Sequence, residues 1–196
     1  MNLENQKQTA ERDPAETPRS GVLGAWDRLV GPGATTAEQS LVLSYGLLFT
    51  VGVLGYANLR SLGWTPLQQV LVAFLALDIA GGIVANTTAS GTRWWHRPGQ
   101  RPHDHFGFVA LHLYPFALAL LFESASWTEA TLVYGYLLVG SAFVLLSPRS
   151  LRRPIAMLST SLGILVAVTV VSLGPGLEWF VPFLYIKLLG GHLASE

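Results

Sequence analysis

The residues of this chain that are best suited to chemistry are concentrated in one stretch, TRWWHRPGQRPHDHFGFVALH (residues 92–112), between two strongly apolar runs. It holds four of the five histidines in the sequence. Imidazole and carboxylate groups ligate zinc and iron when three or four of them converge on one point. They also transfer protons as general acids and bases. The stretch therefore raises two hypotheses, a metal site and an acid–base site.

The spacing of these histidines restricts the metal hypothesis. His105 and His112 share one face of a helix but are separated by about 10.5 Å of helical rise, too far for joint ligation. The sequence contains neither an H-x-x-x-H pair nor an H-E-x-x-H motif. A metal set would therefore combine His112 with His103 or His105 and with Asp78 from another segment. Zinc or iron is the expected metal; haem is less favoured because only His112 lies well inside an apolar run.

Two more polar residues, Asp78 and Asn86, interrupt the apolar run 66–89. A charged side chain inside a membrane span costs about 2.5–3.5 kcal/mol, which makes it a functional candidate. A Gly-Gly pair between the two residues should let the segment that carries His112 approach closely. We expect a catalytic set in which Asp78 orients or charges His112, His112 ligates a metal or moves a proton, and Asn86 positions substrate.

Membrane-spanning helices must position these residues. The chain is 51% hydrophobic and 12% charged, whereas soluble domains carry about 25% charged residues. A helix needs about 20 mainly apolar residues to cross roughly 30 Å of hydrocarbon, and backbone groups in lipid must pair within the segment. The sequence predicts an all-α polytopic membrane protein with six transmembrane helices, at residues 39–58, 66–89, 105–123, 128–147, 152–173 and 177–191.

The distribution of lysine and arginine predicts the orientation of these helices. Eleven of the twelve positive residues, Lys187 among them, fall on one predicted side, and Arg60 alone falls on the other. Lysine and arginine are enriched in cytoplasmic loops. Both termini are therefore predicted to be cytoplasmic, in a chain that crosses the cell (inner) membrane several times.

The segments that flank the predicted helices have their own character. The N-terminus is charged and poor in large apolar residues, which is typical of disorder. Next, Val22, Leu23 and Trp26 recur at helical spacing, as in an interfacial amphipathic anchor or a short helix packed on the bundle. The expected divisions are a disordered tail, an amphipathic segment, the six-helix domain and a C-terminal tail, at residues 1–20, 21–38, 39–191 and 192–196.

The favoured function is a small membrane-embedded enzyme, metal-dependent if the histidine set binds a metal, with a cytoplasm-facing polar site for a lipid or amphiphilic substrate. Two alternatives use the same residues. Asp78 and His112 suit a proton-coupled transporter, and their mutual contact suits a non-catalytic subunit of a larger membrane complex. A net charge of zero gives no indication of nucleic-acid binding, and the lack of cysteine excludes disulfides and thiolate ligands. The sequence leaves homo-oligomerisation open.

Overall fold

The computed structural model describes residues 17–194, and every regular element in that range is a helix. The helices are α1 (Gly21–Val30), α2 (Thr36–Leu59), α3 (Pro66–Ala85), α4 (Ala89–Trp95), α5 (Pro102–Ala110), α6 (Tyr114–Leu121), α7 (Trp127–Leu146), α8 (Arg149–Val170), α9 (Phe180–Tyr185) and a π-helix (Ile186–His192). The predicted all-helical class is confirmed. Most of the predicted disordered tail, 1–16, and residues 195–196 lie outside the described residues.

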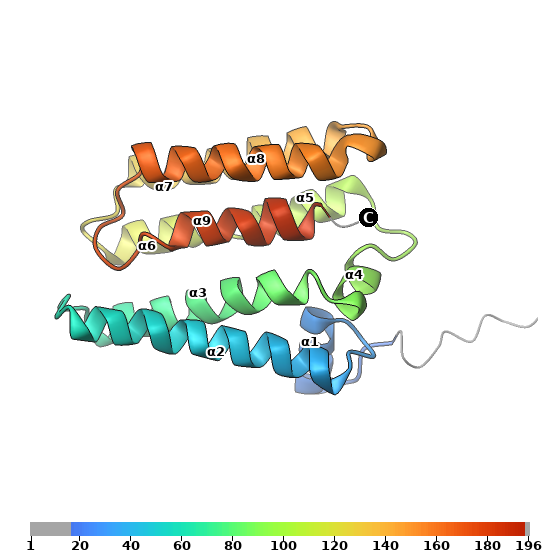
Figure 1. The fold of residues 1–196 in the computed structure, drawn as a ribbon, viewed down its shortest axis with the longest axis horizontal. Coiled ribbons are helices and arrows are strands. Elements are labelled where there is room, and N and C mark those ends of the chain that lie inside the picture. The colour runs from blue at the N-terminus through green and yellow to red at the C-terminus, as the bar shows by residue number, and fades with distance from the viewer. Residues whose placement is uncertain (1–16, 195–196) are drawn as a thin grey trace, which may run out of the picture.

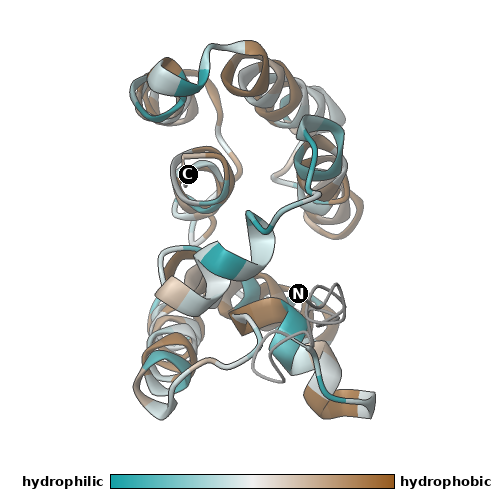
Figure 2. Cartoon of the chain, turned by 90° about the vertical axis from the view of Figure 1, so that its right-hand side faces the viewer, coloured by the Kyte–Doolittle hydropathy of each residue, from teal (hydrophilic) through white to brown (hydrophobic). Residues whose placement is uncertain are grey.

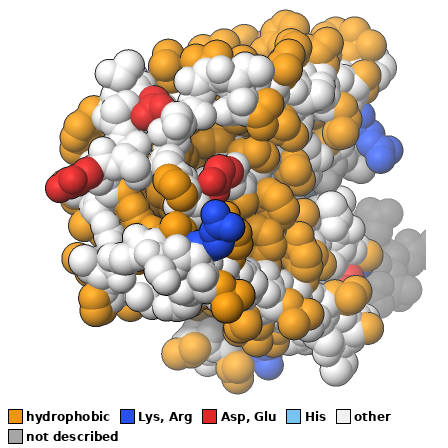
Figure 3. All heavy atoms as spheres, turned by 60° about the vertical axis from the view of Figure 1, so that its left-hand side comes forward, with side chains coloured by type: hydrophobic (Ala, Val, Ile, Leu, Met, Phe, Trp, Pro, Cys, Tyr) orange, Lys and Arg blue, Asp and Glu red, His pale blue; other side chains and the backbone are white. Residues whose placement is uncertain are grey.

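Five helical stretches are long and apolar enough to cross a membrane: Thr36–Leu59, Pro66–Ala85, Pro102–Leu121, Trp127–Leu146 and Arg149–Val170. They run side by side along the long axis of the molecule (Figure 1). Figure 3 shows their flanks covered by hydrophobic side chains, with few charged groups. Side chains such as Leu48 and Val139 are more than two-thirds exposed, which suits contact with lipid. The chain is therefore a helical membrane protein.

Local sequence sets where the long helices begin. α2, α3 and α7 each start at a capping box, in which a Ser or Thr side chain and the side chain three residues later satisfy each other's backbone N–H groups. At α2 the pair is Thr35 and Glu38, so the helix begins at Thr36, three residues earlier than hydropathy indicates. Glu38 also accepts a hydrogen bond from the Ser90 backbone N–H at 3.1 Å, which joins α2 to α4.

Two helical hairpins enclose the C-terminal helix. α2 packs closely on α3, and α7 packs on α8. The C-terminal helix contacts α3, α7 and α8, and Figure 2 shows its end inside the ring that the other helices form. Phe180, Leu184 and Leu188 of this helix are fully buried. The hydrophobic core therefore forms around the last helix of the chain.

The predicted helix 105–123 is two helices in the structure. α5 ends at Ala110 and α6 begins at Tyr114, so that His112 lies in the break. Pro115 has no N–H to donate to the carbonyl four residues earlier, which prevents a continuous hydrogen-bond ladder. The Leu111 carbonyl accepts from the Leu113 backbone N–H at 2.9 Å, and the neighbouring Ala110 carbonyl accepts from the Tyr134 hydroxyl at 2.7 Å. A broken span replaces the expected straight helix.

The last predicted span, 177–191, forms a shorter helix than expected. An irregular segment precedes it, α9 begins at Phe180, and the helix widens into the π-helix from Ile186 to His192. At 1.5 Å per residue, these turns cover about 20 Å, less than the roughly 30 Å of hydrocarbon. Five helices of the described chain therefore have the length and hydropathy that a crossing requires, and this C-terminal helix alone does not have the length.

α1 lies across one end of the α2–α3 hairpin. Val30 is buried against Val42 of α2, and the Trp26 indole N–H donates to the Gln39 side chain at 2.9 Å. The opposite face of α1 is apolar and exposed, at Val22, Leu23 and Leu29. Both interpretations of the amphipathic segment thus describe part of it, because one face packs on the bundle and the other is free to meet the membrane interface.

An ion pair fixes the start of α1. The Arg19 guanidinium donates to both carboxylate oxygens of Asp27, at 2.9 and 2.7 Å. Hydrogen bonds from Arg19 hold the pKa of Asp27 below its ordinary value. The carboxylate is therefore ionised at neutral pH, and the pair holds the chain before α1 against the helix.

The close approach of α2 to α3 can be tested at two glycines of α2. A Cβ at Gly46 would lie 3.0 Å from the Leu77 Cδ1 and 3.3 Å from the Leu77 carbonyl oxygen, whereas one at Gly52 would meet nothing within 4 Å. We expect Gly46→Val to destabilise the protein by about 1–3 kcal/mol through overpacking, and Gly52→Val to change stability little. Thermal unfolding of the detergent-solubilised protein measures both, and equal effects would contradict the packing.

Candidate functional site

A buried ion pair joins α3 to the π-helix. The Lys187 ammonium donates a hydrogen bond to Asp78 Oδ2 at 2.5 Å. The Lys187 side chain is 4% exposed and that of Asp78 is 26% exposed. Desolvating an ammonium group costs several kcal/mol unless a counter-charge lies close to it. Asp78 therefore supplies the partner that lets Lys187 remain charged inside the protein.

His112 and Tyr114, on either side of the break before α6, complete this site. The Tyr114 hydroxyl donates to Asp78 Oδ2 at 2.9 Å. His112 Nδ1 lies 2.9 Å from the Phe108 carbonyl, which can only accept, so Nδ1 carries the proton. In the neutral ring Nε2 is then an acceptor, and it lies 3.2 Å from the Lys187 nitrogen. The four side chains form one network in which each of these contacts pairs a donor with an acceptor.

Irregular backbone positions the two key side chains. His112 lies where α5 gives way to α6, and Lys187 lies in the π-helix, a geometry often found at functional sites. A Cβ at Gly82 would overlap the Lys187 side chain, so this glycine provides the space for it. The Asn86 side-chain amide donates to the Lys187 backbone carbonyl at 3.0 Å, which fixes the π-helical turn.

A cavity of about 390 Å³ leads to this network. One wall comes from α1, α2 and α3, and the other comes from the α4–α6 region. Leu29, Leu43 and Phe74 line the cavity and are each about half exposed, so its mouth lies on the apolar flank of the molecule. Asp78, His112 and Lys187 line it as well. The cavity thus connects a lipid-facing surface to a charged, hydrogen-bonded site.

The structure brings together only part of the set predicted from the sequence. Asp78 and His112 both contact the Lys187 side chain, and the Asn86 side chain contacts the Lys187 backbone. We expected the Gly81–Gly82 pair to face the segment of His112, and this prediction was wrong. Gly81 lies against Val42 of α2, and Gly82 lies against Lys187. The Lys187 side chain therefore occupies the space beside Gly82, where the sequence predicted a close contact between two helices.

The predicted metal site is not supported. Its proposed ligands were His103, His105, His112 and Asp78. The His103 side chain is 70% exposed and pairs with Asp104 at 3.4 Å, and His105 contacts His192 instead of His112. Within residues 17–194, no group of three or more His, Cys, Asp or Glu side chains is arranged to hold a metal ion. The histidines stay apart because His103 and His105 leave α5 about 200° apart and His112 lies in the break after it.

A separate group of histidines, His96, His105 and His192, lies between α4, α5 and the π-helix. The rings of His96 and His105 stack at 4.8 Å, and His105 Nδ1 lies 3.1 Å from His192 Nε2. His192 is 1% exposed, and its Nδ1 has no hydrogen-bond partner within the described part of the chain. The stretch 92–112 is therefore no histidine-rich loop, since His103 and His105 belong to α5 and His96 caps α4.

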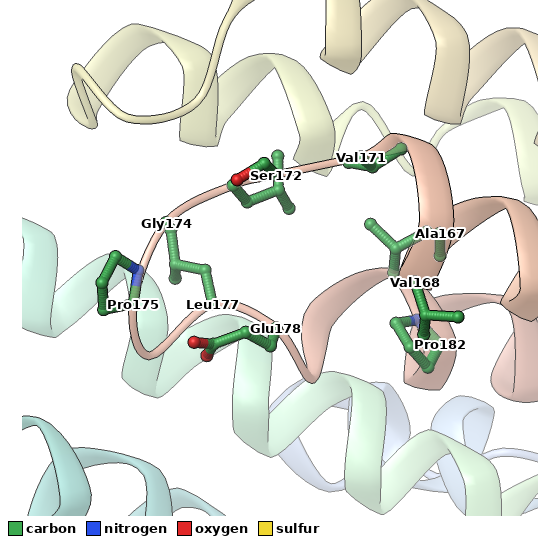
Figure 4. Close-up of a pocket in the computed structure, with 11 residues that line it drawn as sticks. Ala167, Val168, Val171, Ser172, Gly174, Pro175, Leu177, Glu178 and Pro182 are labelled. Carbon is green, nitrogen blue, oxygen red and sulfur yellow. The ribbon is translucent and has the colours of Figure 1, made fainter.

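A second cavity, of about 450 Å³, lies at the opposite end of the molecule from α1. Figure 4 shows Ser172, Leu177 and Glu178 of the irregular segment on one side of the cavity, and Ala167 and Val168 at the end of α8 on the other. Glu178 accepts a hydrogen bond from the Gly176 backbone N–H at 2.7 Å, so its carboxylate supports the local turn. This cavity shows no cluster of chemically reactive side chains.

Fold and site together define a helical membrane protein with a buried Asp–Lys–His–Tyr network at the end of a lateral cavity. No protein-family model, curated protein or solved structure matches the chain. Lys187 is absent from the site predicted from the sequence, because its position near the end of a predicted span places it among the positive charges of the membrane boundary. Its setting in the apolar run FVPFLYIKLLGG was the available signal.

The ion pair can be tested by a double-mutant cycle. Asp78→Asn leaves Lys187 without a counter-charge, and Lys187→Met leaves the carboxylate without one. Breaking a fully buried pair costs about 3–5 kcal/mol, and we expect roughly 1–3 kcal/mol here because Asp78 is partly exposed. The double variant should be more stable than the sum of the two effects implies. Thermal unfolding in detergent measures the cycle, and strictly additive effects would show that the pair is not coupled.

Proposed function

We propose that the protein is a membrane-embedded enzyme that carries out acid–base chemistry on a lipid or amphiphilic substrate. One observation carries this proposal: the apolar, laterally open cavity ends at Lys187, Asp78 and His112. Small-molecule sites are mostly apolar clefts of about 300–1,000 Å³ with a few converging polar groups. The cavity has this composition and size.

The contacts support a role for each residue. The Lys187 ammonium is placed to donate a hydrogen bond to a substrate oxygen, with Asp78 keeping it charged. His112 Nε2 is the acceptor of the network, so neutral His112 is the candidate general base. Tyr114 holds the Asp78 carboxylate, and Asn86 holds the backbone of Lys187. Asn86 is thus a positioning residue in this proposal rather than a substrate ligand.

One observation favours the transporter alternative. Discontinuous helices with charged residues near the midplane are typical of transporter binding sites, and His112 lies in such a break. A carrier would use Asp78 and Lys187 to take up and release a proton. Enzyme and carrier differ in what they produce, because the first changes a lipid covalently and the second moves a solute across a sealed bilayer.

The proposed site also requires a membrane topology. We propose that the C-terminal helix completes a sixth crossing together with the irregular segment before it, whose Leu173 and Leu177 side chains are buried in the core. Non-helical backbone at membrane depth is tolerated where protein surrounds it. The end of the π-helix lies at the same end of the molecule as α1 and α4 (Figure 1). With ten positive residues still on that side, both termini would be cytoplasmic, in the cell membrane.

Lipid turnover tests the proposed enzyme. The protein, reconstituted in nanodiscs, would be incubated with the lipid extract of the cells that express it, and the lipids compared by mass spectrometry. We expect at least one lipid to change with the wild type, and Lys187→Met or His112→Gln to slow this change at least about a hundredfold, as loss of a general acid or base does.

The exposed His103 provides the matched control, since His103→Gln changes the same residue type outside the cavity and should leave turnover unchanged. If the lipids stay unaltered and the protein moves protons across sealed liposomes in a way that depends on Asp78, the protein is a carrier and the proposed enzyme is wrong. If the protein shows neither activity and Asp78→Asn lowers the recovery of a co-purified protein, the result favours the role of a subunit in a larger complex.

Reporter fusions test the topology. Alkaline phosphatase, active only after export, should be inactive when fused to either terminus and active when inserted at 61–64 or 123–125. Green fluorescent protein, fluorescent when it folds in the cytoplasm, should give the opposite result at the C-terminus. A phosphatase-active C-terminal fusion would show that residues 180–192 do not complete a crossing.

A further inference from the structure

We infer that the cavity binds a neutral lipid that carries a hydroxyl group, in preference to lipids with anionic or cationic headgroups. This inference rests on the proposed function, since it names the substrate class of the same site. Four features of the cavity carry it: its charge balance, its depth, its hydrogen-bonding groups and its mouth.

The charges at the inner end of the cavity cancel. Among the described residues that line it, Asp78 and Lys187 alone carry a formal charge, and they pair with each other at 2.5 Å. An anionic headgroup would have to compete with Asp78 for Lys187, and a cationic one would have to compete with Lys187 for Asp78. Neither meets an uncompensated partner charge.

The depth of the site also disfavours a charged headgroup. Asp78 lies seven residues before the end of α3, or about 10 Å along the helix axis. Moving an ion into a membrane interior is costly unless a partner is waiting for it. A hydroxyl group loses much less hydration and regains it through hydrogen bonds.

The hydrogen-bonding groups at this depth suit a hydroxyl. The Lys187 ammonium has three N–H groups, of which the structure assigns one to Asp78 and one to His112. Asp78 and His112 Nε2 are acceptors. A hydroxyl can accept from Lys187 and donate to either acceptor, which satisfies both of its hydrogen-bonding capacities.

The mouth of the cavity fits the apolar part of such a lipid. Leu29, Leu43 and Phe74 line the mouth and are 55, 45 and 55% exposed on the flank of the bundle. A lipid could therefore insert its head while its chain stays in contact with the bilayer. Entry from the bilayer needs no passage through water.

Photolabelling tests the inference. Wild-type protein in phosphatidylcholine nanodiscs would be labelled with hexadecanol that carries a diazirine in its chain, and the labelled peptides identified by mass spectrometry. Unlabelled hexadecanol, hexadecyl phosphate and hexadecyltrimethylammonium would compete. We expect label on α1, α2 and α3 at the cavity, with hexadecanol competing at least about tenfold better than either ion, a difference of ~1.4 kcal/mol.

Charge variants sharpen the experiment. Asp78→Asn leaves Lys187 unbalanced and should raise competition by hexadecyl phosphate about tenfold, whereas Lys187→Met should do the same for hexadecyltrimethylammonium. The double variant is neutral again and should prefer hexadecanol, as the wild type does. If the single variants do not fold, the competition series on the wild type still decides the question.

A matched pair of substitutions on α1 locates the binding site. Leu29 and Leu23 are both 55% exposed, but only Leu29 lines the cavity. Leu29→Trp should reduce labelling and Leu23→Trp should not. Equal competition by all headgroups, or stronger competition by an ion, would overturn the inference. Because labelling reads binding alone, labelled protein without lipid turnover would overturn the enzyme and leave the inference standing.

Discussion

The arrangement of this protein depends on accommodating the Lys187 side chain in the interior of a helical bundle. Lys187 is almost fully buried, so its charge requires a carboxylate within hydrogen-bonding distance. That requirement links α3 to the last helix of the chain, which also hydrogen-bonds to α7 through the Tyr185 hydroxyl and the Val133 carbonyl. It also explains two local features. Gly82 leaves room for the lysine side chain, and Asn86 fixes the lysine backbone. Together these contacts fix the position of the C-terminal helix along the axis of α3.

Irregular backbone at two positions places the side chains of the site, at the break around His112 and in the π-helix around Lys187. A regular helix satisfies its own N–H and C=O groups and presents only side chains, whereas a break brings polar backbone within reach of its neighbours. The break at His112 lets the Tyr134 hydroxyl bind a carbonyl of α5, and it directs His112 and Tyr114 toward the ion pair. The π-helix does the equivalent for Lys187. His112 and Lys187 therefore lie where two helices depart from regular geometry, and Asp78 reaches them from the regular helix α3.

Much of the fold follows from the sequence, and less of the site does. Hydropathy predicts the five long helices among its six spans, because burial in lipid leaves the backbone few alternatives. It does not predict the shortened last helix, since an apolar run of fifteen residues has the same pattern whether it meets lipid or protein. Asp78 and His112 were identifiable because polar groups in apolar runs are rare. Their partner was not, since a lysine near the end of a predicted span has the same pattern as a topology signal.

The histidines show why residue type alone misassigned the chemistry. Four of them are close in sequence, yet the structure divides them among an exposed position, a buried cluster and the ion-pair network. The division follows from helix geometry: His103 and His105 leave α5 about 200° apart, at 100° per residue, and His112 lies beyond the end of α5. His192, far away in sequence, then joins His105 and His96 because the π-helix ends beside them. Proximity in sequence therefore said less about this site than the depth at which each polar group lies.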